Sequence, residues 1–178
     1  MKTRIALVMG DITGMDVEAV VNAANTTLLG GGGVDGAIHR AAGPKLLAEC
    51  ALLGGCATGQ AKMTKGYNLK ARSVIHTAGP VWRGGKGNEE KLLADCYYNC
   101  LELARLNGIR SIAFPAISTG AYRFPFESAA AIALGTVGTY ITQYPDVFEK
   151  IVFVLFSPGD LSIYQVLSRK IFHDDPDR

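Results

Sequence analysis

The chain has 178 residues, of which 48% are apolar, and 18 Lys and Arg against 16 Asp and Glu give a formal net charge of +2. This length fits one domain with a continuous core, which we expect to span residues 1–178. So small a charge does not indicate a nucleic-acid or membrane surface. No stretch is long enough to cross a bilayer and no export signal precedes the first apolar run, so the expected location is the cytoplasm.

Strand-like and helix-like runs alternate along the chain. Apolar and β-branched runs predict strands at 5–9, 18–24, 59–64, 73–77, 112–117 and 151–156. Apolar spacing predicts helices at 92–104, 127–144 and 161–172, and residues 34–53 hold one helix or two, with a break near Gly43-Pro44. This alternation predicts a mostly parallel sheet covered on both faces, with ligands bound beyond the carboxyl ends of its strands.

The glycine run Gly30–Gly33 is the strongest local feature. Four adjacent glycines are costly inside a helix or strand, and they leave backbone N–H groups uncovered. These groups can converge on phosphate oxygens, and a helix that begins near Val34 adds its positive end. Asn25 before the run and Asp35 after it can face whatever the loop holds. A flexible surface loop is the alternative interpretation.

A second candidate loop, residues 115–122, follows a predicted buried strand directly. Its small residues let backbone amides approach a ligand, and Ser118 and Thr119 add hydroxyl groups. A rival interpretation makes Ser118 a nucleophile with Asp160 and His173 as partners, in the chain order of an α/β-hydrolase. The missing first glycine of the nucleophile elbow, and the position of His173 in a tail expected to be frayed, disfavour it.

Two further residues follow predicted strands. Asp11 can accept a hydrogen bond from an exocyclic amine such as adenine N6, or it can cap a turn together with Thr13. Phe156 can stack on a base, or it can belong to the core.

Neither the histidines nor the cysteines predict a metal site. We expect His39 and His76 to be hydrogen-bonded structural residues. The cysteines contain no Cys-x-x-Cys pair, and free cysteine is among the most buried residue types, so we expect buried thiols, no metal and no cofactor. They are Cys50, Cys56, Cys96 and Cys100.

These motifs occur in an order that resembles the MacroD-type branch of the macrodomain family over nearly the whole chain. They are Gly10–Thr13, Asn22–Asn25, the glycine loop through Pro44, His76–Pro80 and Pro115–Tyr122. The resemblance implies a three-layer α/β/α sandwich with a mixed, mostly parallel central sheet. It also implies that the ligand is ADP-ribose.

The resemblance assigns a role to each motif. Asp11 and Ile12 would hold the adenine, with Phe156 against the ring. Asn25 would orient the distal ribose, and Asp35 would be the catalytic acid/base. The diphosphate and distal ribose would lie between two loops, one formed by Gly32, Gly33 and Val34 and the other by Ser118, Thr119, Gly120, Ala121 and Tyr122.

The implied activity is hydrolysis of esters on the distal ribose. The substrates would be O-acetyl-ADP-ribose, which is deacetylated, and proteins that carry mono-ADP-ribose on acidic side chains. Two alternatives use the same pocket. One is a reader module that binds ADP-ribose without turnover, and the other is a phosphatase that acts on ADP-ribose 1″-phosphate. The presence of both Asn25 and Asp35 favours the hydrolase.

Overall fold

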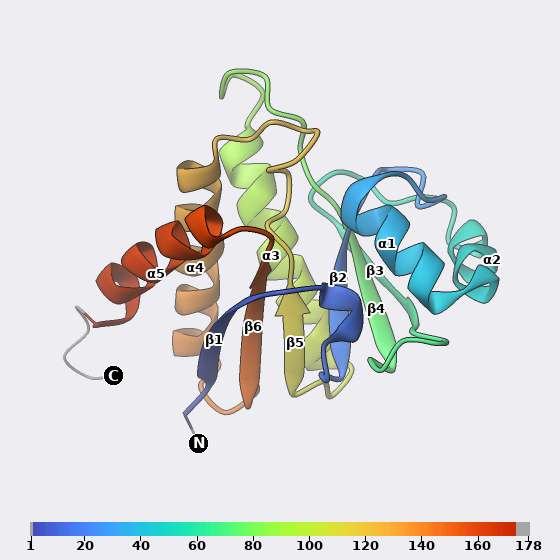
Figure 1. Ribbon diagram of the computed structural model, residues 1–178, viewed down its shortest axis with the longest axis horizontal. Helices are drawn as coiled ribbons and strands as arrows, with labels where there is room; N and C mark the ends of the chain where they lie inside the picture. The colour runs from blue at the N-terminus through green and yellow to red at the C-terminus, as the bar shows by residue number, and fades with distance from the viewer. Residues whose placement is uncertain (1, 174–178) are drawn as a thin grey trace.

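A computed structural model describes residues 2–173. They contain one six-stranded sheet (Figure 1). The strands are β1 (Arg4–Met9), β2 (Ala19–Ala24), β3 (Ala61–Lys65), β4 (Ser73–Ala78), β5 (Ser111–Phe114) and β6 (Lys150–Leu155). Their spatial order is β1-β6-β5-β2-β4-β3. Only β3, at one edge, runs antiparallel to its neighbour, so the prediction of a mixed, mostly parallel sheet is confirmed.

Helices cover both faces of this sheet, which gives the three layers (Figure 1). One face carries α1 (Gly33–Ala42) and α2 (Pro44–Leu52), together with the short 3-10 helix η1 (Ile12–Gly14). The other face carries α3 (Glu89–Leu106), α4 (Phe126–Gln143) and α5 (Pro158–His173). None of the helices within residues 2–173 has the length and apolarity needed to cross a membrane.

Two apolar cores result from the alternation of side chains along the buried strands. Ile75 and Phe114 point toward α3 and α4, whereas their neighbours Val74 and Ala113 point toward α1 and α2. A strand buried on both faces needs apolar residues at every position. This requirement explains the unbroken apolar runs that predicted β5 and β6 from the sequence.

The predicted strand 112–117 is too long. β5 ends at Phe114, because Pro115 has no N–H to continue the ladder. Tyr97 of α3 holds the chain that leaves the sheet: its hydroxyl donates to the carbonyl of Pro115 and accepts from the N–H of Ile117, each at 3.2 Å. The chain therefore leaves the sheet at Pro115, which is where the sequence predicts the second loop to begin.

Residues 34–53 form two helices. The break falls at Gly43, whose φ of +88° is unfavourable for residues with a side chain. Pro44 opens α2, where its missing N–H has no intrahelical partner to lose. The other predicted elements lie within a few residues of their observed bounds. The predicted frayed tail from His173 onward falls largely outside the described residues, and the prediction of one domain over 1–178 stays a prediction.

Candidate active site

The loops that follow β2, β5 and β6 meet at one edge of the sheet around a cavity of about 500 Å³. Parallel strands bring their carboxyl ends to the same edge, so residues far apart in sequence become neighbours. A smaller niche beside the cavity contains the residues after β1 and shares Val34, Pro115 and Phe156 with it. The predicted residues that line the cavity are Asn25, Gly32, Gly33, Val34, Asp35, Ser118, Thr119, Gly120, Ala121, Tyr122 and Phe156. Asp11 and Ile12 line the niche.

The glycine loop runs into the N-terminus of α1. Gly32 is the N-cap residue and no side chain caps the helix. The first amides of a helix have no intrahelical partners, so those after Gly32 are available to an anion at the positive end of the helix dipole. This geometry supports the predicted phosphate contact better than the flexible-loop alternative.

Asp35 and Asn25 converge above Gly31. A Cβ atom added to Gly31 would lie 3.0 Å from Oδ2 of Asp35 and 3.5 Å from Nδ2 of Asn25. The carboxylate and the amide therefore face the same small space, which stays open because residue 31 has no side chain. Asp35 lies in the first turn of α1 and is only 4% exposed.

The side chain of Asn25 is also engaged within its own loop. Nδ2 donates to the carbonyl of Gly30 at 3.0 Å, and Oδ1 accepts from the N–H and the hydroxyl of Thr27. These bonds fix the start of the glycine loop in an Asx-turn. Of the groups that Asn25 offers, one Nδ2 hydrogen is not used by the described residues.

A buried polar network supports Asp35 from behind. Asn22 and His76 are paired in register on β2 and β4. Nδ2 of Asn22 donates to Oδ1 of Asp35 at 2.9 Å and lies 3.1 Å from Nδ1 of His76. The other ring nitrogen of His76 lies 2.9 Å from the hydroxyl of Thr64. His39, one turn along α1, places Nε2 3.4 Å from the same Asp35 oxygen.

Burial lowers the pKa of His76 to about 4, and the nearby His39 adds to this effect. His76 is therefore neutral near pH 7. Because Nδ1 faces an amide hydrogen of Asn22, we assign the proton to Nε2, from which it is donated to Thr64. The expectation of a structural, hydrogen-bonded histidine is confirmed for His76. It is wrong for Nε2 of His39, which is buried and has no hydrogen-bond partner among the described residues.

The second loop is held in a strained conformation on the opposite wall. Ser118 has a φ of +66°, unusual for a residue with a side chain. Its hydroxyl is buried and has no hydrogen-bond partner among the described residues, and Gly79 packs directly against it. The hydroxyl of Thr119 donates to the carbonyl of Ala116, so it serves the loop rather than offering a free donor as expected.

The niche after β1 contains the three predicted adenine contacts, Asp11, Ile12 and Phe156. Asp11 caps η1, where one carboxylate oxygen accepts from the N–H and the hydroxyl of Thr13 at 2.9 and 2.7 Å. These two bonds lower the pKa of Asp11. Its second carboxylate oxygen accepts no hydrogen bond from the described residues. Phe156 is 72% exposed, so the interpretation that places it in the core is wrong and its ring is free to stack.

Nine residues that line the cavity were not predicted as ligand contacts: Ala23, Ala24, Gly31, Gly79, Pro115, Ala116, Ile117, Phe126 and Asp160. Asp160 had been considered only as a member of a serine triad. The Ser118 hydroxyl has no histidine partner in the described part of the chain, and the side chain of His173 lies outside it. The signal that could have revealed the network was polarity inside strands, since Asn22 and His76 interrupt otherwise apolar runs.

All four cysteines are buried free thiols, as expected. Burial raises the pKa of Cys50 and of Cys96 to about 11. Within residues 2–173, no three His, Cys, Asp or Glu side chains are grouped so that they could hold a metal ion.

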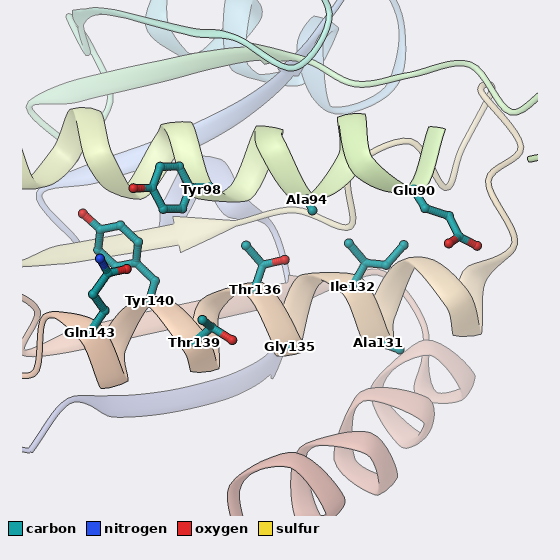
Figure 2. A pocket seen from close by; sticks show the side chains of 10 residues that line it. All are labelled: Glu90, Ala94, Tyr98, Ala131, Ile132, Gly135, Thr136, Thr139, Tyr140 and Gln143. Atoms are coloured by element: carbon teal, nitrogen blue, oxygen red, sulfur yellow. The ribbon is translucent and has the colours of Figure 1, made fainter. Parts of the chain in front are cut away.

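A second hollow, of about 410 Å³, lies between α3 and α4 and shares no residue with the cavity at the strand ends. Figure 2 shows Tyr98 and Tyr140 at one end of this groove and Glu90 at the other. Its remaining lining is mainly alanine, threonine and isoleucine. With a single carboxylate and no histidine, lysine or second acid in its lining, the groove offers no catalytic arrangement comparable to the one around Asp35.

Comparison with known proteins agrees with the fold and the cavity. The Macro domain family model matches residues 21–133. A macro domain-containing protein of Chlorobaculum tepidum is 59% identical over 161 residues, which cover 90% of this chain and 93% of that protein. The O-acetyl-ADP-ribose deacetylase of Escherichia fergusonii is 54% identical over 171 residues, which cover 94% of this chain and 96% of that enzyme.

Among solved structures, the Trypanosoma brucei macrodomain in complex with ADP-ribose matches with a TM-score of 0.86 and 46% identity, over 91% of this chain and 68% of that one. The fold and cavity define a three-layer α/β/α domain whose main cavity is built from loops at the carboxyl ends of parallel strands. The chain belongs to the macrodomain family. The resemblance drawn from the sequence motifs is thus confirmed.

Proposed function

We propose that this protein is an ADP-ribose-binding hydrolase that cleaves esters on the distal ribose. Its substrates are O-acetyl-ADP-ribose and proteins with mono-ADP-ribose on acidic side chains. The observation that carries the proposal is the convergence of Asp35 and Asn25 over Gly31, between two loops rich in backbone amides. The names of the relatives support it, because one is an O-acetyl-ADP-ribose deacetylase and another was crystallised with ADP-ribose.

The cavity suits a diphosphate without using cationic side chains, since none of its lining residues is Lys, Arg or His. Backbone amides after Gly32 would bind the diphosphate from one side, and those after Ser118 from the other. The adenine would lie in the niche between Asp11 and Phe156. The distal ribose would then reach the space above Gly31.

In the proposed reaction, Asp35 acts as a general base. Its carboxylate takes a proton from a water molecule, and the resulting hydroxide attacks the acyl carbon of the ester. The bond between the acyl carbon and the ribose oxygen breaks, and the ribose oxygen receives the proton from Asp35. The products are a free carboxylic acid and ADP-ribose. Asn22 holds the carboxylate in place through a hydrogen bond to Oδ1, which leaves Oδ2 toward the open space.

The test uses O-acetyl-ADP-ribose and, separately, a protein with glutamate-linked mono-ADP-ribose. Release of ADP-ribose is followed by mass spectrometry for the wild type, Asp35→Ala and the exposed control Asp16→Asn. We expect Asp35→Ala to reduce kcat about a hundred- to ten-thousandfold. The control should retain full activity.

Reaction in ¹⁸O-labelled water locates the bond that breaks. The proposal requires the label in the released carboxylic acid. Label in ADP-ribose would instead place the attack at a ribose carbon and refute the acyl mechanism. Binding of ADP-ribose without turnover of either substrate would support the reader alternative, whereas turnover of ADP-ribose 1″-phosphate alone would support the phosphatase.

A further inference from the structure

Asp160 lines the cavity but has no role in the proposed reaction. It lies in the first turn of α5 and lines the same cavity as Phe156 and Phe126. Phe156 belongs to both the cavity and the niche. A ligand that runs from the niche to the two amide-rich loops must therefore pass beside Phe156. Asp160, four residues further along the chain, flanks that passage.

The carboxylate of Asp160 is half-buried and is not engaged by the described residues. The N–H of Asp160 donates to the Ser157 hydroxyl at 3.1 Å, a bond that does not involve the carboxylate. Tyr164 packs below, against Phe126, with ring centroids 5.8 Å apart. Burial raises the pKa of Tyr164 well above its ordinary value, and the charge of Asp160 adds to the rise. The Asp160 carboxylate is thus a charged hydrogen-bond acceptor that lines the cavity and receives no hydrogen bond from the described residues.

We propose, building on the proposed function, that Asp160 accepts hydrogen bonds from the hydroxyl groups of the adenosine ribose and so selects ADP-ribose against its 2′-phosphorylated form. If adenine occupies the niche and the diphosphate lies between the loops, the sugar that joins them is the adenosine ribose. Its two hydroxyls are the only donors that this part of the ligand can present. They match the acceptor that Asp160 provides.

The same carboxylate opposes a phosphate on that sugar. A 2′-phosphate would replace a donor with a dianion next to Asp160, and the lining contains no Lys, Arg or His to compensate. Like charges placed in contact strongly disfavour the wrong partner. Dinucleotide-binding proteins of another fold use the same logic, since an acidic residue on the ribose 2′-hydroxyl distinguishes the two forms of the nicotinamide cofactor.

Calorimetric titration with ADP-ribose and with its 2′-phosphorylated form tests the inference. The proteins are the wild type, the nearly isosteric Asp160→Asn and the charge-matched control Asp16→Asn, which lies in an exposed turn. We expect the wild type to bind ADP-ribose at least about tenfold more tightly than the phosphorylated form. In Asp160→Asn this ratio should fall to about threefold or less, mainly through tighter binding of the phosphorylated ligand. Asp16→Asn should keep the wild-type ratio.

Wild-type protein that binds the two ligands equally would overturn the inference, as would a ratio left unchanged in Asp160→Asn. Both results leave the proposed function intact, because ADP-ribose still binds. Failure of the wild type to bind ADP-ribose at all would overturn the proposed function and this inference together. Circular dichroism of Asp160→Asn confirms that the comparison is made between folded proteins.

Discussion

Nδ2 of Asn22 lies between Nδ1 of His76 at 3.1 Å and Oδ1 of Asp35 at 2.9 Å, so one buried amide connects a histidine of β4 to the candidate base. The arrangement requires a neutral His76 with its proton on Nε2. Protonation of Nδ1 would set an N–H donor against the amide donor of Asn22. The orientation of Asp35 therefore depends on a histidine that does not itself line the cavity.

This dependence predicts that stability falls in mild acid. The pKa of His76 is about 4 in the folded protein and about 6.5 in an unfolded chain. Between these values the unfolded chain binds a proton that the folded protein does not, so the free energy of unfolding decreases as the pH falls from about 6.5 to about 4. The full loss is about 3 kcal/mol. Urea unfolding at several pH values in this window measures it.

His76→Gln provides the control, because it removes the titrating group while keeping a polar side chain. The variant should be less stable near neutral pH and should show a flatter dependence on pH over the same window. Equal slopes for the wild type and the variant would show that other groups cause the acid effect.

A second prediction concerns Gly31. Its φ is not in the left-handed region, so Gly31→Ala places no strain on the backbone, but the new methyl group would lie 3.0 Å from Oδ2 of Asp35. We expect kcat for O-acetyl-ADP-ribose to fall about tenfold to a hundredfold, since small displacements of reacting groups are costly. Gly14→Ala, where nothing lies within 4 Å, should leave kcat unchanged. Full activity of Gly31→Ala would show that the reaction does not need the space above Gly31.

Gly79 should be intolerant of any side chain. A Cβ atom there would lie 2.3 Å from the hydroxyl oxygen of Ser118 and 2.8 Å from Ile117, so the loop over the diphosphate would have to move. We expect Gly79→Ala to weaken ADP-ribose binding at least about tenfold and to cost about 1–3 kcal/mol of stability. Calorimetry and thermal unfolding measure the two effects.

Gly135→Ala is the matched control, since this residue lies within α4 and nothing is found within 4 Å of an added Cβ atom. Alanine should stabilise the helix by about 0.5–1 kcal/mol without a change in affinity. Equal affinities for Gly79→Ala and the wild type would contradict the proposed place of the second loop.

The cysteines should be inert in the native protein. With a pKa of about 11, Cys50 and Cys96 are about 0.1% thiolate at pH 8, and both are fully buried. A colourimetric disulfide reagent should therefore react with them very slowly under native conditions. With the unfolded chain it should react with all four cysteines and release four equivalents of its coloured thiolate. Rapid labelling of the native protein would reveal local opening around α2 or α3.

The sequence was most informative where one physical requirement dominates. Strands buried on both faces must be apolar throughout, so β5 and β6 were visible, and Gly43-Pro44 marked the break between α1 and α2. The Ser118 loop was placed correctly, but its strained φ and the support from Tyr97 were not foreseeable, since both depend on contacts across the sheet. For the same reason the link from Asn22 to Asp35 emerged only from the contact of α1 with β2, and the link from Asn22 to His76 only from the pairing of β2 with β4.

The lack of cationic side chains in the cavity has a consequence for the conditions under which the protein works. The partial charges at a helix end are smaller than the full charge of lysine or arginine and act only over the first turn, although salt screens them too. Nucleotide anions held by long, exposed cationic side chains are released as ionic strength rises. Here the affinity for ADP-ribose should fall less steeply with ionic strength, so binding would depend more on shape and hydrogen-bond geometry than on the surrounding electrolyte.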